Sequence, residues 1–235
     1  MARLPAAELE AITPLLEHVD LPKDFVLAQP DKPITHIYFL ERGLGSLVAV
    51  SPEGQKAEAG MFGYDGFCPT PPSVRSSVSM HEAVIQSPGY GYRIKVEDLW
   101  AVMVKSPVLT DILHRSVHNL STQVSYTALS NAIHHVDERL SRWLLMCHDR
   151  LRQDELRITH EYMALMLAVR RPSVTTSLHI LEGNLFIRSE RGRVTIRNRK
   201  ALEEFAQDAY GKPEAEYALL FPPVAGAQRI GVNGQ

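Results

Sequence analysis

The spacing of apolar residues divides the chain into a β-rich first part and a helical second part. Residues 4–18 have apolar side chains at helical spacing, which predicts a short helix with Leu4, Leu9, Ile12, Leu15 and Leu16 on one face. Residues 24–96 then contain short β-favouring runs at 25–27, 35–40, 46–50, 83–86 and 91–94. Turn signals separate them at Pro30-Asp31, Arg42-Gly43, Pro52-Glu53-Gly54, Asp65-Gly66 and Pro88-Gly89. Many short strands with regular turns predict an antiparallel β-roll or jelly roll over residues 1–105.

A long helix is predicted next, over residues 106–135. Ser106 can cap it and Pro107 suits its first turn. Its apolar positions follow the 4-3-4-3-4 spacing of a helix–helix seam, formed by Leu113, Val117, Leu120, Val124, Thr127 and Asn131. A helix of this length suits dimerisation, and the polar Thr127 and Asn131 could set the register between two chains. The β-roll could equally be the neighbour of this seam.

Residues 136–210 alternate between helical and hairpin patterns. His134-His135-Val136-Asp137 is typical of a hinge with Asp137 as N-cap, and an amphipathic helix follows over 138–150. Two helical runs lie within 159–181, a hairpin is predicted over 184–197, and a helix follows at 199–208. We expect residues 211–235 to form a tail, loosely ordered in its Gly/Pro-rich end from Pro222.

Charge is unevenly distributed along the chain. The formal net charge is −2, yet residues 160–200 hold eight Lys or Arg and three Asp or Glu, a net +5. Such an asymmetry is expected where one domain meets a polyanion, although a solvated basic face explains it too. No apolar run approaches the roughly 20 residues of a membrane span, and the N-terminus lacks a signal-peptide layout. We therefore expect a cytoplasmic protein without a membrane partner, in which the two cysteines are packed free thiols.

The order helix, sharp turn, helix and hairpin within residues 159–196 is that of a winged helix-turn-helix. In this motif the second helix enters the DNA major groove. Thr159 can cap the first helix, while Val174, Leu178 and Leu181 can anchor the second. The candidate DNA-binding residues are Arg170, Arg171, Ser173, Thr175, Thr176 and His179, with Arg188, Arg191 and Arg193 on the wing. The alternative is a helical hairpin with a charged surface.

These motifs resemble the Crp/Fnr (cyclic-AMP receptor protein) family of bacterial transcription regulators. The resemblance is strongest over 158–196, "ITHEYMALMLAVRRPSVTTSLHILEGNLFIRSERGRVTI", and extends to "THIYFLERGLGSLVAV" and "HHVDERLSRWLLMCHDRL". It implies an α+β protein with an N-terminal cyclic-nucleotide-binding-like β-roll, a dimerisation helix and a C-terminal winged helix-turn-helix. It also implies a homodimer on near-palindromic double-stranded DNA, with RNA polymerase as a further partner. Arg171 corresponds to the family's recognition-helix arginine. The glutamate common at the next position is Pro172 here, and a later arginine of some members is replaced near Thr176, so the operator sequence does not carry over.

The nucleotide-binding cassette of this family, Phe-Gly-Glu-Leu followed by Arg-Ser/Thr-Ala, is not preserved. Asp65 or Thr70 could stand at the glutamate position, with Arg75-Ser76 as a phosphate grip, whereas another alignment puts Glu82 at the arginine position. A carboxylate there would repel phosphate, and prolines 69, 71 and 72 remove backbone donors. We therefore expect no control by cyclic AMP. Haem or iron–sulfur sensing is not expected either, because the chain lacks an N-terminal cysteine cluster and offers only Cys68 and His81 as haem ligands.

The sequence lacks the motifs of the enzymes that use a β-barrel or a zinc site. A barrel oxygenase needs clustered histidines and carboxylates, but His36 and His81 are isolated. The pairs His81-Glu82 and His160-Glu161 lack the second histidine of a zinc protease, so we expect neither a metal site nor catalysis. A cyclic-nucleotide-responsive regulator, or a degenerate sensor that acts through protein contacts, remains the alternative.

Overall fold

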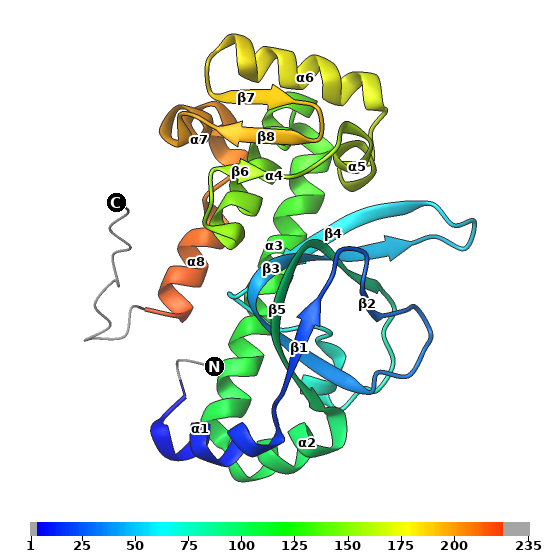
Figure 1. Cartoon of the computed structure of the whole chain (residues 1–235), viewed down its shortest axis with the longest axis vertical. Coiled ribbons are helices and arrows are strands. Elements are labelled where there is room, and N and C mark those ends of the chain that lie inside the picture. Colours follow the sequence, from blue (N-terminus) through cyan, green and yellow to red (C-terminus); the bar gives the residue numbers. More distant parts are fainter. Residues whose placement is uncertain (1–3, 223–235) are drawn as a thin grey trace.

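The structure, a computed structural model, describes residues 4–222 of the 235-residue chain. A β-rich domain and a smaller domain follow one another along the long axis of the molecule, and a long helix (α3) runs beside the β-rich domain to reach the smaller one (Figure 1). The smaller domain combines helices with a three-stranded sheet. The architecture is the expected mixture of an antiparallel N-terminal sheet, a long helix and a C-terminal helix-turn-helix.

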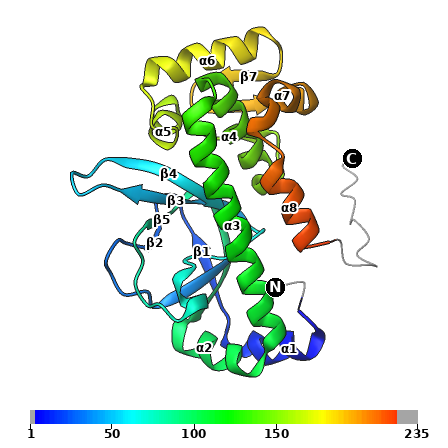
Figure 2. The same ribbon diagram turned by 180° about the vertical axis from the view of Figure 1, so that it is seen from behind.

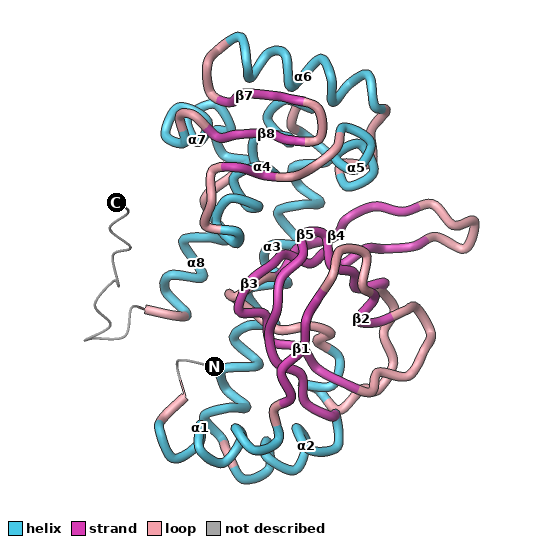
Figure 3. Tube along the Cα trace, in the orientation of Figure 1, coloured by secondary structure: helices cyan, strands magenta, loops and turns pink. Residues whose placement is uncertain are grey.

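The N-terminal sheet is antiparallel and has the order β1-β5-β3-β4, with β2 also paired to β5. Its strands are β1 (Glu17–Leu21), β2 (Val26–Ala28), β3 (His36–Val50), β4 (Lys56–Phe62) and β5 (Glu82–Lys95). Figure 3 shows how these strands curve into a roll, with α1 (Ala6–Ile12) and α2 (Val96–Lys105) below it. The roll interior is packed with apolar side chains such as Leu21, Leu40 and Ile85. Cys68 lies in this interior, where burial raises the pKa of its thiol.

Two predicted turns, at Arg42-Gly43 and Pro88-Gly89, lie inside long strands instead. β3 and β5 pair along most of their length, with register shifts between Leu40 and Gly45. Gly43 has φ +99°, which absorbs such a shift, and a Cβ on Gly89 would lie 2.1 Å from the Arg42 carbonyl oxygen. The glycines therefore permit a bulge and a close backbone approach rather than a chain reversal. As a result, the predicted strands at 35–40 and 46–50 are both part of β3, and those at 83–86 and 91–94 are both part of β5.

The predicted helix over 4–18 is shorter in the structure. Helix α1 covers Ala6–Ile12, a 3₁₀ turn covers Thr13–Leu15, and β1 begins at Glu17. Pro14 lacks the N–H that a continuing helix would need, and the following residues pair with β5 instead. Helix α2 (Val96–Lys105) and strand β4 were not predicted; a second 3₁₀ turn covers Pro71–Val74.

Helix α3 (Pro107–Ile133) begins as predicted, with the Ser106 hydroxyl accepting a hydrogen bond from Leu109 N at 3.0 Å. One side of the helix packs on the β-roll. Leu113 is 1% exposed within the core of its own roll, so it is not available to a second chain. Gln123 lies on the same side, because its amide binds both the N–H and the carbonyl of Met61 on β4.

The second domain begins with α4 (Val136–Leu151), for which His135 rather than Asp137 is the N-cap residue. It continues with β6 (Glu155–Leu156), α5 (His160–Met166), α6 (Arg171–Gly183), β7 (Ile187–Glu190), β8 (Arg193–Ile196) and α7 (Arg199–Ala206), followed by a 3₁₀ turn at Gln207–Ala209. The hairpin β7–β8 confirms the predicted wing, and β6 adds a third strand in the order β6-β8-β7. Cys147 on α4 is buried in the domain core, where burial raises the pKa of its thiol.

A last helix, α8 (Lys212–Leu220), occupies part of the predicted tail. It lies along α3 (Figure 2), where Glu216 pairs with His118 at 2.8 Å and Arg115 donates to the Leu220 carbonyl at 3.3 Å. The sequence holds its start signal: Pro213 stands in the first turn, and the Glu214 carboxylate accepts from Gly211 N at 3.0 Å. The rest of the predicted tail, 223–235, lies outside the described residues.

The two domains share one hydrophobic core. Leu44 and Met61 of the β-roll belong to the same buried cluster as Trp143 of α4 and Met166 of α5. A buried carboxyl group lies at this junction. Glu58 on β4 is 6% exposed and accepts hydrogen bonds from Trp143 Nε1 at 2.8 Å, from Gln86 Nε2 at 2.5 Å and from the Ser46 hydroxyl. Burial raises its pKa to about 7, although these hydrogen bonds favour the ionised form.

Candidate nucleic-acid interface

Helices α5 and α6 form the predicted helix-turn-helix. The Thr159 hydroxyl accepts from Tyr162 N at 3.2 Å and caps α5, as predicted. The chain reverses at Ala168, which has φ +50°, and α6 begins after the extended N-cap residue Arg170. Val174, Leu178 and Leu181 are fully buried, which confirms the predicted anchor positions of α6.

The opposite face of α6 is exposed at one end of the molecule (Figure 1). Arg170, Arg171, Thr176 and His179 are exposed on or next to this helix, while Ser173 and Thr175 are half-buried. The Thr175 hydroxyl donates to the Arg171 carbonyl at 3.2 Å and lies 3.0 Å from His160 Nδ1. It therefore ties α6 to α5, whereas the Thr176 hydroxyl donates within its own helix to Pro172.

The wing stands beside the N-terminal part of α6 and a groove separates them. Thr159, Glu161, Arg171, His179 and Arg191 are among the residues that line this groove. The turn of the wing needs Gly192 at φ +72°, which is a left-handed conformation that glycine adopts without strain. The structure thus places α6 and the wing arginines on one surface.

Several of these arginines form ion pairs with carboxylates. The sequence pattern did not predict these pairs. Arg171 Nε lies 2.6 Å from Glu161 Oε1, and Arg188 Nη2 lies 2.8 Å from Glu190 Oε1. Arg193 also pairs with Glu190. The hydrogen bond from Arg193 is the largest of the effects that lower the pKa of Glu190, so this carboxyl group is ionised at neutral pH. Within residues 4–222, Arg170 and Arg191 form no ion pair.

The proposed effector residues each contact other parts of the chain. Asp65 pairs with Arg150 of α4 at 2.8 Å, Arg75 lies 5.5 Å from the Trp100 ring centre, and Glu82 binds Lys56 at 2.8 Å. The Thr70 carbonyl accepts from Ser73, and the Ser76 hydroxyl lies 3.5 Å from the Val78 carbonyl oxygen. Among the described residues these five share no hydrogen bond or ion pair with one another.

The described part of the chain offers neither a metal site nor a membrane span. Between residues 4 and 222, no group of three or more His, Cys, Asp or Glu is placed to hold a metal ion. No helix in this range has both the length and the hydropathy that a membrane span needs.

The fold defines a class of protein: a β-roll joined through a long helix to a winged helix-turn-helix. Residues 138–205 match the model of the Crp-like helix-turn-helix domain. The protein therefore carries a Crp-like helix-turn-helix and has the fold of the Crp/Fnr transcription regulators, as the sequence resemblance implied.

Solved structures support this fold over most of the chain. A Crp/Fnr-family protein from Eubacterium rectale is 19% identical with a TM-score of 0.68, covering 88% of this chain and 96% of its own. The c-di-GMP-responsive global regulator CLP of Xanthomonas campestris is 15% identical with a TM-score of 0.67, covering 82% and 99%. A Crp/Fnr-family transcriptional regulator of Thermus thermophilus is 19% identical with a TM-score of 0.66, covering 81% and 98%. No curated protein sequence matches the chain.

Proposed function

We propose that the protein is a sequence-specific transcription regulator that binds double-stranded DNA as a homodimer. The observation that carries this proposal is the exposed N-terminal face of α6 beside the wing, within a Crp-like helix-turn-helix domain. Recognition helices of this kind enter the major groove with their N-terminal residues toward the base edges. On a bound operator, the dimer would act on transcription through RNA polymerase.

The candidate residues have distinct roles in this proposal. Arg170 and Arg171 stand where a guanidinium can make two hydrogen bonds to a guanine base. Thr176 and His179 lie further along the exposed face, and Arg188, Arg191 and Arg193 suit backbone phosphates. Binding would exchange the carboxylate partners of Arg171, Arg188 and Arg193 for DNA. The chain would thereby lose protein ion pairs that are exposed and individually weak.

The dimer interface in this proposal is the uncovered side of α3. The β-roll lies on one flank of this helix and α8 on the other (Figure 2). Exposed positions recur along the remaining side at intervals of 7, 4, 3 and 4, namely His114, Ser121, Ser125, Ala128 and Ala132. Leu129 and Ile133 flank them and are 44% and 60% exposed. Of the predicted seam, Val117 and Val124 border this side half-buried, and Asn131 is exposed.

We further propose that cyclic AMP does not control the protein. The residues that could stand in for the family's cassette already have other contacts. Asp65 is held by Arg150, Glu82 by Lys56, and Arg75 lies over Trp100. A cyclic phosphate would have to displace these contacts without the backbone donors that the prolines of this loop lack.

The test is operator binding by an Arg171→Ala variant. An operator is first selected from random DNA with the wild-type protein, and affinities are then measured by fluorescence anisotropy against nonspecific competitor, with and without cyclic AMP. We expect the variant to lose about 1–3 kcal/mol of binding free energy on the operator, because a bidentate base contact is removed. Lys105→Ala is the matched control, since this exposed lysine ends α2 at the opposite end of the molecule (Figure 1). Unchanged operator affinity in Arg171→Ala would refute the role of Arg171, and a response to cyclic AMP would refute the proposal on the sensor.

A further inference from the structure

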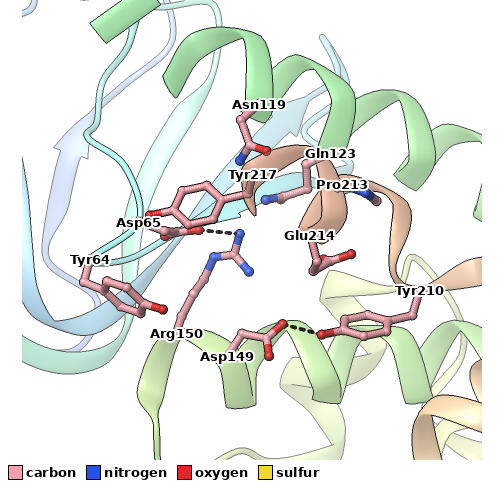
Figure 4. Close-up of a pocket in the computed structure, with 10 residues that line it drawn as sticks. All are labelled: Tyr64, Asp65, Asn119, Gln123, Asp149, Arg150, Tyr210, Pro213, Glu214 and Tyr217. Carbon is pink, nitrogen blue, oxygen red and sulfur yellow. Dashed lines mark hydrogen bonds and ion pairs between the residues drawn. The ribbon is translucent and has the colours of Figure 1, made fainter. Parts of the chain in front are cut away.

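A polar cavity of about 190 Å³ lies between the two domains (Figure 4). The loop after β4 contributes Tyr64 and Asp65, and α3 contributes Asn119. The smaller domain closes the cavity with Arg150 of α4 and Glu214 of α8. A molecule bound here would touch the β-roll, the long helix and the DNA-binding domain at the same time.

Three carboxylates and one guanidinium line this cavity, and most of these charges are already balanced. The buried Arg150 and the half-buried Asp65 form an ion pair of 2.8 Å, although Arg150 Nε has no hydrogen-bond partner among the described residues. Asp149 pairs with Arg199 at 2.7 Å and accepts from the Tyr210 hydroxyl at 2.7 Å. The carboxylate of Glu214 is the exception, because no residue within 4–222 forms an ion pair with it.

The carboxylate of Glu214 can therefore form an ion pair with a bound cation. One of its oxygens accepts from Gly211 N at the start of α8. Burial raises the pKa of this carboxyl group, although the guanidinium groups of Arg150 and Arg142 act against this shift without forming an ion pair with it. A positively charged group beside it would relieve the cost of burying its charge.

Asn119 provides a second hydrogen-bond acceptor, and no donor in the described part of the protein binds it. The residue is 7% exposed, and its Oδ1 has no hydrogen-bond partner among the described residues. A buried amide oxygen left unpaired costs free energy, which a donor on a bound molecule would recover. Figure 4 shows Asn119 at the edge of the cavity that Glu214 also lines.

Aromatic rings complete the surroundings. Tyr64, Tyr210 and Tyr217 lie around the same space (Figure 4). Tyrosine rings attract cations through their negative faces, and two of these rings already do so: Arg152 lies 3.5 Å from the Tyr64 ring centre and Arg199 lies 5.9 Å from that of Tyr210. An ammonium group supplies both the positive charge and several N–H donors, whereas an anion would meet the unpaired carboxylate of Glu214.

We propose that this cavity binds a small organic amine in its protonated form, with Glu214 and Asn119 receiving the ammonium group. The volume exceeds that of a cavity of about 150 Å³ that holds benzene, so a single ring with a short aminoalkyl group fits. Binding does not depend on DNA. That the amine would be the signal for the regulator rests on the proposed function.

The test titrates benzylamine into the full-length protein without DNA, observed by ligand NMR, with benzyl alcohol and benzoate as neutral and anionic probes of similar shape. We expect saturable binding of benzylamine alone, with a dissociation constant on the order of 1 mM for so small a probe. Glu214→Gln should weaken it about tenfold, because the carboxylate charge is lost while the glutamine can still accept from Gly211 N. Glu216→Gln is the control on the same helix, as this residue pairs with His118 on α3 and does not line the cavity.

A second variant should change the affinity for benzylamine in the opposite direction. Asn119→Asp adds a carboxylate of the same size and should tighten benzylamine binding, which general damage to the fold would not do. Absence of saturable benzylamine binding, equal binding of benzyl alcohol, or equal affinity in Glu214→Gln would each overturn the proposal. Because the titration contains no DNA, its failure leaves the Arg171 experiment unaffected, and a failure of DNA binding leaves the titration interpretable.

Discussion

Glu58 is a buried carboxyl group at the junction between the domains. Its pKa is about 7 in the folded protein, whereas its ordinary value is 4.5. Between these pH values the folded protein holds a proton that the unfolded chain releases. Stability therefore falls as the pH rises from about 4.5 to about 7, and the loss amounts to about 3 kcal/mol.

Glu58→Gln should remove this pH dependence. The amide is neutral at every pH, and it can still accept from Trp143 Nε1. We expect the variant to be more stable than wild type at about pH 8 and similar to it at about pH 4.5. Urea unfolding at both pH values measures the difference, with Glu53→Gln in an exposed turn as control. An equal slope of stability against pH in wild type and Glu58→Gln would contradict the role of this carboxyl group.

At the same scale, the sequence predicted which residues face outward on α6 but not how they are paired. The burial of Val174, Leu178 and Leu181 follows from their spacing. The exposed face of α6 could therefore be predicted as the side opposite these three residues. The ion pair between Arg171 and Glu161 depends on how α5 crosses α6. Helical spacing contains no such information. Glu190, by contrast, is near Arg188 and Arg193 on one hairpin, and alternation along the strands could have indicated that cluster.

At the scale of elements, helices with clear caps were predictable and long strands were not. Ser106 and Thr159 mark real helix starts, and both caps form. The glycines of β3 and β5 gave the sequence signal of a turn because bulges and turns both use left-handed or unhindered backbone. Which of the two forms depends on pairing between distant strands, and local patterns do not specify that pairing.

The long helix leads to a prediction about assembly. If the uncovered side of α3 joins two chains, a charge placed on this side should separate them, because a buried unpaired carboxylate is costly. We expect Ala128→Glu to be monomeric by light scattering while the wild type is a dimer. Ala101→Glu, at an exposed position of α2, should leave the mass of the assembly unchanged. A dimeric Ala128→Glu, or a monomeric wild type, would contradict this interface.

At the scale of the whole molecule, the shared core joins the two domains in one folding unit. Met61 is 1% exposed and packs in the cluster that also contains Trp143 and Leu144 of α4. We expect heat unfolding to show a single calorimetric transition for both domains. Met61→Ala should lower its stability by about 2–5 kcal/mol, because truncation of a buried methionine leaves a cavity.

The control for this experiment is Met80→Ala, since Met80 is 69% exposed on the β-roll. Two separate transitions in the wild type, or a destabilisation confined to the β-roll in Met61→Ala, would show that the domains unfold independently.

The location of Leu44 and Met61 has a practical consequence for building hybrid regulators. The order of domains along the sequence suggests a chimera cut at the end of the long helix, near residue 135. It would place Leu44 and Met61 of the β-roll against a foreign surface and leave the space that they fill beside the smaller domain empty. Transplanting the β-roll of this protein would therefore require the matching positions of α4 and α5 to be transferred with it.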